Sequence, residues 1–311
     1  MIYFAFGVAA LAAIVQLSAT LREAQALRDF PPEGQLLEVD GRQVHAVVMG
    51  SGPDLVLIHG ASGNTRDMTF SLAPRLAARY RVIVFDRPGL GYTERLNGTG
   101  ATLLEQATLL RAAAQQLDAE RPMLMGQSYG GAVALAWAAH FPSDVAALVP
   151  VAAASNTWDT PLSTFHHVTS SRLGQALVVP LITAFVPKSV VENAVEAVFD
   201  PQDAPEGYAG HVGAALTLRR VSLRANADQR ANILYEINAL IPLYENISAP
   251  TEIVHGTADT TVGLHIHSAK LVHQIEGATL TRLSGIGHMP HHTAQDAVIA
   301  AIDRAARRAG F

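Results

Sequence analysis

Short apolar runs alternate with longer segments of helical periodicity in the first half of the chain. The runs are too short for buried helices and are bounded by glycine, proline or polar residues, as is typical of strands buried on both faces of a sheet. The predicted strands are Leu55–Ile58, Val82–Phe85, Met123–Met125 and Val145–Val151, and the predicted helices between them are Met68–Arg79, Leu103–Leu117 and Gly131–His140. This alternation predicts an α/β fold with a doubly wound, mostly parallel sheet, in one fold rather than two domains.

The pattern changes on either side of this region. On the amino side, Phe30–Gly34 is typical of a stiff linker, because two prolines and a glycine cannot continue a helix. A hairpin is then predicted from Gln35–Asp40 and Gln43–Met49, with its turn at Gly41-Arg42. On the carboxyl side, strand and helix alternate again over Thr251–His255, Leu264–Ile275, Ala278–Leu283 and a final helix, Ala294–Arg308.

Residues 155–246 lack this alternation. They are rich in helix formers and are broken by prolines at positions 180, 187, 201 and 205. We therefore predict a helical cap inserted above the sheet. The predicted division of the chain is an apolar segment at 1–29, a core at 30–154 and 247–311, and the cap at 155–246.

The amino-terminal segment is uncharged from residue 2 to residue 21. At about 1.5 Å per residue it would form about 30 Å of helix, close to the thickness of a bilayer core. A signal peptide is one alternative, since Ala24-Gln25-Ala26 resembles a cleavage site, although Arg22-Glu23 fits poorly there. An apolar helix packed on the domain is another. We expect an uncleaved membrane anchor at residues 2–21, with no signal for its orientation.

Composition narrows the class of function. Hydrophobic residues make up 49% of the chain and charged residues 16%, which allows a large core. The formal net charge of −5 lacks the excess of positive charge that is typical of nucleic-acid-binding proteins. The absence of cysteine excludes disulfides, thiolate nucleophiles and sulfur-ligated metals.

The segment Gly126–Gly131 (GQSYGG) carries the main chemical signal. It follows an apolar strand and opens a helix, so its glycines permit the sharp turn that exposes a serine hydroxyl at the carboxyl end of a sheet. We predict Ser128 as a nucleophile, with the amide of Tyr129 as an oxyanion donor at the helix start. The alternative, a βα turn with a serine cap, would need no partners for Ser128.

A serine nucleophile needs a base, and the base needs an acid. His288 follows the last predicted strand in a glycine-loosened loop, and we prefer it to His291 and His292, whose alternative role is that of surface polar residues. Asp259 follows the strand Thr251–His255 and is the predicted acid, with a helix cap as its alternative. The order serine, aspartate, histidine is the order that the α/β-hydrolase fold uses.

Other residues complete the predicted site. The segment His59–Gly63 follows a strand, and Ala61 is the first choice for a second oxyanion amide, with Ser62 the second choice and a substrate contact. Trp158 and Phe165 are candidates for the substrate pocket, with core packing an equal alternative. A metal site is not expected, because the nearby pair His265 and His267 would face different sides of a helix.

Five motifs together resemble the α/β-hydrolase superfamily, in its branch of cap-bearing esterases, haloperoxidase-like enzymes and carbon–carbon bond hydrolases. They are HGASGN at 59–64, DRPGLGYT at 86–93, GQSYGG at 126–131, HGTADTTV at 255–262 and GIGHMPHH at 285–292. The resemblance spans roughly residues 34–310. It implies a Ser-His-Asp triad and agrees with Ala61 as the oxyanion donor. Serine rather than aspartate at position 128 argues against the haloalkane dehalogenase and epoxide hydrolase branches, whose nucleophile is a carboxylate.

These observations predict a serine hydrolase acting on a small apolar ester or related acyl compound, without a metal or cofactor. A histidine base predicts that ester turnover falls below about pH 6.5. Acyl transfer and carbon–carbon cleavage stay open, since they use the same residues. The alternative from another class is a non-catalytic accessory or binding subunit, tethered to a membrane complex by residues 2–21.

Overall fold

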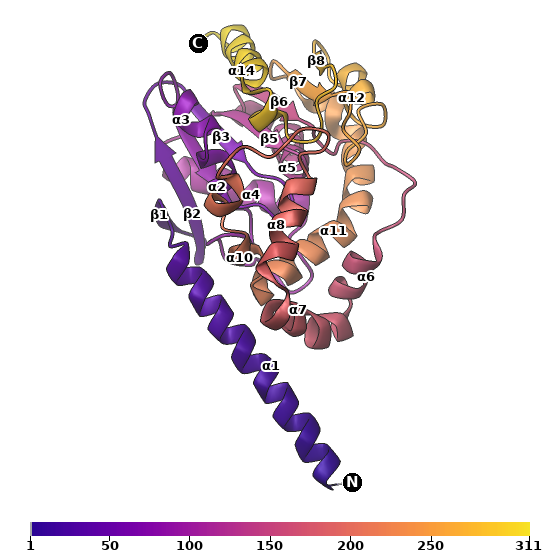
Figure 1. Cartoon of the computed structure of the whole chain (residues 1–311). Coiled ribbons are helices and arrows are strands. Elements are labelled where there is room, and N and C mark those ends of the chain that lie inside the picture. The colour runs from indigo at the N-terminus through magenta and orange to yellow at the C-terminus, as the bar shows by residue number, and fades with distance from the viewer. Residues whose placement is uncertain (1) are drawn as a thin grey trace.

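The computed structural model describes residues 2–311 and has an eight-stranded sheet in the order β1-β2-β4-β3-β5-β6-β7-β8 (Figure 1). The hairpin β1–β2 joins the sheet antiparallel to β4, and the remaining neighbours are parallel. The strands are β1 (Gln35–Val39), β2 (Arg42–Met49), β3 (Asp54–Ile58), β4 (Arg81–Phe85), β5 (Met123–Gln127), β6 (Ala147–Val151), β7 (Glu252–Gly256) and β8 (Thr279–Leu283). The predicted doubly wound, mostly parallel α/β sheet is confirmed.

Alternate residues of the central strands face opposite sides of the sheet, which gives two hydrophobic cores. Val56 and Ile58 belong to one core, whereas Leu55 and Leu57 belong to the other. The first core is covered by α4 (Leu103–Gln116), α5 (Tyr129–His140) and α12 (Ser268–Gln274), together with residues 233–244, and the second by α2 (Thr65–Thr69), α3 (Leu72–Leu76) and α14 (Gln295–Ala309). The short helices η1 (Pro142–Asp144) and α13 (Pro290–Thr293) follow α5 and precede α14, respectively. Both faces of the sheet are therefore buried, as the apolar strands require.

Two local predictions were wrong. The hairpin turn lies at Asp40-Gly41, where both residues have positive φ (50° and 71°), because an Asp-Gly pair suits the turn that matches strand twist. The predicted helix Met68–Arg79 is broken into the two short helices α2 and α3. Pro74 lies in the first turn of α3, and its ring would clash with the carbonyl of Phe70 if the helix ran through.

Residues 155–246 are mostly helical. Figure 1 shows α6, α7 and α11 gathered on the side of the molecule from which the amino-terminal helix projects. The elements are α6 (Thr164–Ser170), η2 (a π-helix, Gly174–Val178), α7 (Val179–Phe185), α8 (Lys188–Ala197), α9 (Tyr208–His211), α10 (Ala214–Thr217), α11 (Arg220–Leu240) and η3 (Ile241–Asn246). We call this segment the cap.

Helix α1 (Ile2–Asp29) extends away from the rest of the molecule (Figure 1). Residues 3–14 are exposed on every side, and only the second half contacts the cap, where Val15 and Ala19 pack on Ala184 of α7. The guanidinium of Arg22 donates to the carbonyl of Val186 at 2.9 Å. The stretch Tyr3–Asp29 is long and apolar enough to cross a membrane, a property that a signal sequence would share.

Candidate active site

Ser128 lies at a strained turn between β5 and α5. Its backbone has φ +54° and ψ −116°, a conformation that a non-glycine residue keeps only when its surroundings enforce it. The surroundings are tight: a Cβ on Gly126 would lie 2.2 Å from the carbonyl oxygen of Gly130, and one on Gly130 would lie 2.2 Å from that of Ile58. The glycines of the motif are therefore needed for the chain to make this turn.

The three predicted catalytic side chains form one hydrogen-bonded line. His288 Nε2 lies 3.0 Å from Ser128 Oγ, and His288 Nδ1 lies 2.8 Å from Asp259 Oδ2. Asp259 follows β7 and His288 follows β8, so the ends of two parallel strands bring them to the serine. All three are buried, with Ser128 only 7% exposed.

The Asp259 carboxylate contacts three further groups, all within four residues of it in the chain. Its Oδ1 accepts the backbone amides of Thr261 and Val262, and His255 Nε2 lies 3.1 Å from the Oδ2 that also meets His288. Burial would raise the pKa of the Asp259 carboxyl, but the hydrogen bonds from His255, His288 and the Val262 amide bring it well below its ordinary value. Asp259 is therefore a stable anion facing His288.

Among the described residues, the backbone amides of Tyr129 and Ala61 are free donors beside Ser128 in the chain or the adjoining loop. Tyr129 N–H is the first amide of α5 and has no acceptor in its own helix. Within residues 2–311, neither this amide nor that of Ala61 has a backbone or side-chain acceptor, whereas Ser62 N–H donates to Asn226 Oδ1 at 2.8 Å. Of the two residues predicted to supply a second oxyanion amide, Ala61 thus has a free N–H, whereas the N–H of Ser62 is already hydrogen-bonded.

The comparisons with known proteins agree with this geometry. A family model described as the alpha/beta hydrolase fold matches residues 53–182, and the solved structures with the same fold include lipases and esterases. The chain therefore has the α/β-hydrolase fold.

Three proteins that are similar to this chain have names that state different functions. The chain is 28% identical to the magnesium-chelatase 30 kDa subunit of Rhodobacter capsulatus, over 79% of this chain and 84% of that one. A membrane phospholipase A has a similar structure (TM-score 0.66, 21% identity, covering 98% and 99% of the two chains). So does a thermophilic esterase from Thermogutta terrifontis (TM-score 0.71, 20% identity, covering 89% and 99%).

A buried arginine supports the loop at residues 59–63, which contains Ala61. Arg87 donates to the carbonyl oxygens of His59 and Gly60, each at 3.0 Å, and to the side chains of Gln106 and Gln229. Its guanidinium also stacks 4.2 Å from the ring centre of Tyr129. Burial lowers the pKa of Arg87 to about 10, so it stays charged at neutral pH.

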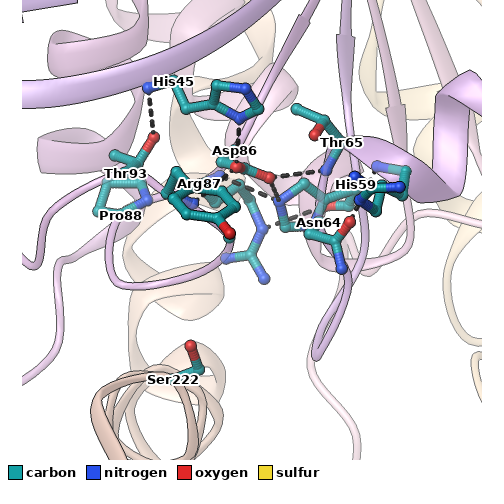
Figure 2. A network of polar contacts seen from close by, with 12 residues as sticks. His45, His59, Asn64, Thr65, Asp86, Arg87, Pro88, Thr93 and Ser222 are labelled. Carbon is teal, nitrogen blue, oxygen red and sulfur yellow. Dashed lines mark hydrogen bonds and ion pairs between the residues drawn. The ribbon is translucent and has the colours of Figure 1, made fainter. Parts of the chain in front are cut away.

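Asp86 fixes the same loop from the other side. Figure 2 shows its carboxylate between His45 and Thr65, with His45 Nδ1 at 2.6 Å and the Thr65 amide at 2.6 Å. Burial would raise the Asp86 pKa, but the His45 contact holds it below its ordinary value. The DRPG segment (residues 86–89) therefore supports residues on both sides of Ala61.

The loop that carries His288 is fastened by a cluster that sequence reasoning missed. His291 and His292 are buried rather than surface residues, and their Nε2 atoms lie 3.3 and 2.8 Å from Asp67, which also accepts the Tyr208 hydroxyl at 2.7 Å. Gln127 adds a second tie, donating to the His288 carbonyl at 3.1 Å.

This cluster has the composition of a metal site as well as a structural role. The donor atoms of Asp67, His291 and His292 lie within 4.8 Å of one another, so they are the residues that could hold a divalent cation. Burial lowers the pKa of His291 to about 4. A neutral His291 can donate its Nε2–H to the Asp67 carboxylate, which accounts for the contact without a metal.

The two aromatic pocket candidates lie in different surroundings. Trp158 is half-buried, packs against the first core and meets the His267 ring edge-on at 5.6 Å. Phe165, on α6, is 50% exposed and meets the ring of His166. Trp158 thus has the core packing that was its alternative role, and Phe165 presents an apolar surface on the cap.

Proposed function

We propose that this α/β hydrolase is a serine hydrolase that cleaves a carboxylic ester or related acyl compound through an acyl-enzyme. The observation that carries the proposal is the hydrogen-bonded line from Ser128 through His288 to Asp259. A serine hydroxyl gains nucleophilicity only from such an adjacent base. No step of this chemistry requires a metal or cofactor.

The residues have separate roles in the proposed reaction. His288 Nε2 takes the proton of Ser128 Oγ as that oxygen attacks the substrate carbonyl, and Asp259 stabilises the imidazolium. The amides of Tyr129 and Ala61 donate to the oxyanion. His288 then protonates the leaving alcohol, and a water activated by the same base releases the acid.

An apolar acyl group is the substrate class that we propose. The similarity to proteins named esterase and phospholipase supports it. Trp158 and Phe165 are the aromatic residues proposed to line the acyl pocket. Ser62, which follows Ala61 in the chain, is also proposed to contact the substrate.

A fluorophosphonate probe tests the nucleophile. The wild-type protein should be labelled, and Ser128→Ala should lose labelling completely. Ser143→Ala, which changes an exposed serine of η1, is the matched control and should be labelled like the wild type. Equal labelling of wild type and Ser128→Ala would contradict the proposal.

We also propose that residues 2–21 anchor the protein in a membrane. The exposed apolar surface of α1 supports this, since residues 3–14 are all exposed. The full-length chain should remain in the membrane fraction after carbonate extraction and keep its amino terminus. A mature protein that begins just after Ala26 would identify a signal peptide instead.

A second candidate function is an accessory subunit of a membrane complex. The 28% identity to a protein named as a magnesium-chelatase subunit is the observation that favours it. Stoichiometric copurification with a membrane complex, together with no turnover on a broad panel of acyl esters, would support this candidate over the hydrolase.

A further inference from the structure

A cavity of about 360 Å³ lies where α1 meets the start of α11, away from the Ser128 site. Helix α1 contributes Glu23 and Leu27 to its lining. The remaining lining residues are Arg95, Arg219, Arg220, Val221 and Arg224. Four guanidinium groups around one cavity are unusual, because like charges repel each other unless anions lie between them.

The carboxylates near the cavity balance only half of this charge. Glu23 pairs with Arg220 at 2.6 Å, and Asp228 pairs with Arg95. Arg219 and Arg224 have no carboxylate partner within residues 2–311 and donate to neutral oxygens, including the Gln175 carbonyl, 2.9 Å from Arg224. The lining together with Asp228 therefore has a formal net charge of about +2.

Two donors of the cluster are left without acceptors. The Nε atoms of Arg95 and Arg224 are buried and have no hydrogen-bond partner within residues 2–311. Burial lowers the pKa of Arg224, and the charges of Arg220 and Arg95 lower it further. An oxyanion with several acceptor oxygens would satisfy these donors and offset the repulsion.

The position of the cavity along α1 indicates where such an anion would come from. Glu23 and Leu27 follow the uncharged residues 2–21, so at about 1.5 Å per residue they lie about 3 and 9 Å beyond the end of that stretch. The headgroup layer of a bilayer occupies about 5–8 Å on each side of its core. The arginines therefore lie at the depth of lipid phosphates, if α1 spans the membrane as proposed above.

The surface beside the arginines is apolar, which suits a lipid better than a free ion. Leu27 and Val221 in the lining are 39% and 42% exposed. Arg224 bonds directly to η2, and η2 and α7 carry large apolar side chains that face outward. These are Leu177 (64% exposed), Leu181 (45%) and Phe185 (54%), with Leu173 (74%) just before η2.

Helix α7 adjoins the anchor itself. Val15 and Ala19 of α1 pack on Ala184, and Arg22 bonds to the Thr183 and Val186 carbonyls at the end of α7. Because α7 lies level with residues 15–22 of α1, a bilayer that accommodates residues 2–21 also reaches the outward side chains of α7 and η2. The arginine cavity and this apolar surface would then face the same leaflet.

We propose that the cavity lined by Arg95, Arg219, Arg220 and Arg224 binds the phosphate of an anionic phospholipid headgroup, with the cap resting on the membrane beside it. This inference rests on the proposed anchor at residues 2–21. It assigns a lipid site that is separate from Ser128 and that orients the catalytic domain on the bilayer.

Calorimetric titration of the full-length protein in neutral detergent micelles tests this. The probes are dihexanoyl phosphatidylglycerol, dihexanoyl phosphatidylcholine and inorganic phosphate, added to the Ser128→Ala variant so that lipid hydrolysis gives no heat. Phosphatidylglycerol should bind tightest, because the choline ammonium is repelled by the cavity and free phosphate lacks apolar contacts. Phosphate binding as tight as phosphatidylglycerol would overturn the lipid assignment.

Variants in the same background locate the site. Arg224→Gln should weaken phosphatidylglycerol binding about tenfold or more, the effect of losing one charged hydrogen-bonding group, and Arg224→Lys should weaken it less. Arg121→Gln, which changes an exposed arginine outside the cavity, should bind like the parent. Unchanged binding in Arg224→Gln would overturn the site.

The outcomes separate this proposal from those on which it builds. Binding is measured without turnover, so it holds or fails independently of Ser128 chemistry. Carbonate extraction reports the anchor by itself. Retention in the membrane without phosphatidylglycerol binding would overturn the headgroup site and leave the anchor intact.

Discussion

At the residue scale, the site depends on one carboxylate oxygen that serves two histidines. Asp259 Oδ2 meets both His288 Nδ1 and His255 Nε2, while Oδ1 is taken by the amides of Thr261 and Val262. An ionised carboxylate accepts on both oxygens and donates from neither, whereas an amide side chain accepts on only one atom. The residue must therefore be aspartate for His288 to keep its proton on Nδ1 and leave Nε2 free for Ser128.

Asp259→Asn should lower kcat for an activated ester by up to about 10⁴, the effect known for such triads. The amide oxygen would stay with the Thr261 and Val262 amides, and the amide NH₂ would face His288 Nδ1 and favour the wrong tautomer. Steady-state kinetics check this, with Asp118→Asn, outside the site, as control. A loss of less than tenfold would argue against Asp259 as the acid.

Arg87 gives a second prediction at this scale. Arg87→Lys should lower the free energy of unfolding by about 2–4 kcal/mol, because one ammonium cannot reach the four oxygens that the guanidinium satisfies. It should also lower kcat, since the carbonyls of His59 and Gly60 fix the loop that carries Ala61. Urea denaturation and ester kinetics measure the two effects. Full stability in Arg87→Lys would contradict this account.

The sequence predicted those site residues whose position follows from a strand end. Ser128, Asp259 and His288 each come directly after an apolar run, and parallel strands bring their carboxyl ends to one edge. Asp67 and His255 carry no such signal. Asp67 meets His291 and Tyr208 from distant parts of the chain, and His255 lies inside a buried strand where the sequence pattern shows only hydrophobic neighbours.

At the element scale, the start of α4 is joined to the cap helix α11. The α4 end is capped by Thr102 and Glu105, which accept and donate reciprocally as a capping box. The next free amide, that of Leu103, donates to Glu236 of α11. The other oxygen of Glu236, Oε1, is buried without a partner within residues 2–311. The contact between α4 and α11 therefore uses only one of the two carboxylate oxygens of Glu236.

Glu236→Gln should stabilise the protein at pH 8. Burial raises the pKa of Glu236 to about 7, whereas glutamate in the unfolded chain has a pKa of about 4.5. Between these values the folded protein binds a proton that the unfolded chain does not, so the free energy of unfolding falls as the pH rises from about 4.5 to about 7. Glutamine keeps an acceptor for Leu103 and carries no charge. The melting temperature should rise by roughly 2–4 °C at pH 8 and change little at pH 4.5. Glu120→Gln, an exposed change, is the control, and a lower melting temperature in Glu236→Gln at pH 8 would contradict the argument.

Element boundaries show where sequence patterns fail. The strands were found nearly to the residue, because burial on both faces leaves continuous apolar runs. The apolar spacing of residues 68–79 predicts a single helix. The structure has two short helices there, because Pro74 fits the first turn of a new helix but not the middle of a long one. The π-helix η2 has no sequence signature that distinguishes it from the α-helical turns around it.

At the scale of the whole molecule, buried neutral histidines join distant segments of the chain, and one of them joins the core to the cap. His59 Nε2 accepts the Arg87 amide at 3.0 Å, and His267 Nδ1 accepts the amides of Ser155 and Asn156 at 3.1 Å. A ring nitrogen that accepts cannot carry a proton. Burial lowers the pKa of both histidines to about 4, and nearby positive charges add to the effect.

The free energy of unfolding should therefore fall as the pH drops from about 6.5 to about 4. In that range the unfolded chain binds protons that the folded histidines do not, at up to about 1.4 kcal/mol per pH unit for each histidine. Urea midpoints across this range measure the slope. His267→Asn should flatten it, whereas His273→Asn, at an exposed position, should leave it unchanged; a flat wild-type profile would contradict the prediction.

The contacts between α1 and the cap leave no hinge between this helix and the rest of the molecule. Val15, Ala19 and Arg22 fasten the helix to α7, and the Glu23–Arg220 pair fastens it to α11. For an anchored chain, Ser128 would then keep a fixed height above the bilayer. A thicker or thinner bilayer, which tilts a spanning helix to match its hydrophobic length, would tilt the whole enzyme with it. Lipid thickness would thereby become a determinant of how the active site is presented to its substrate.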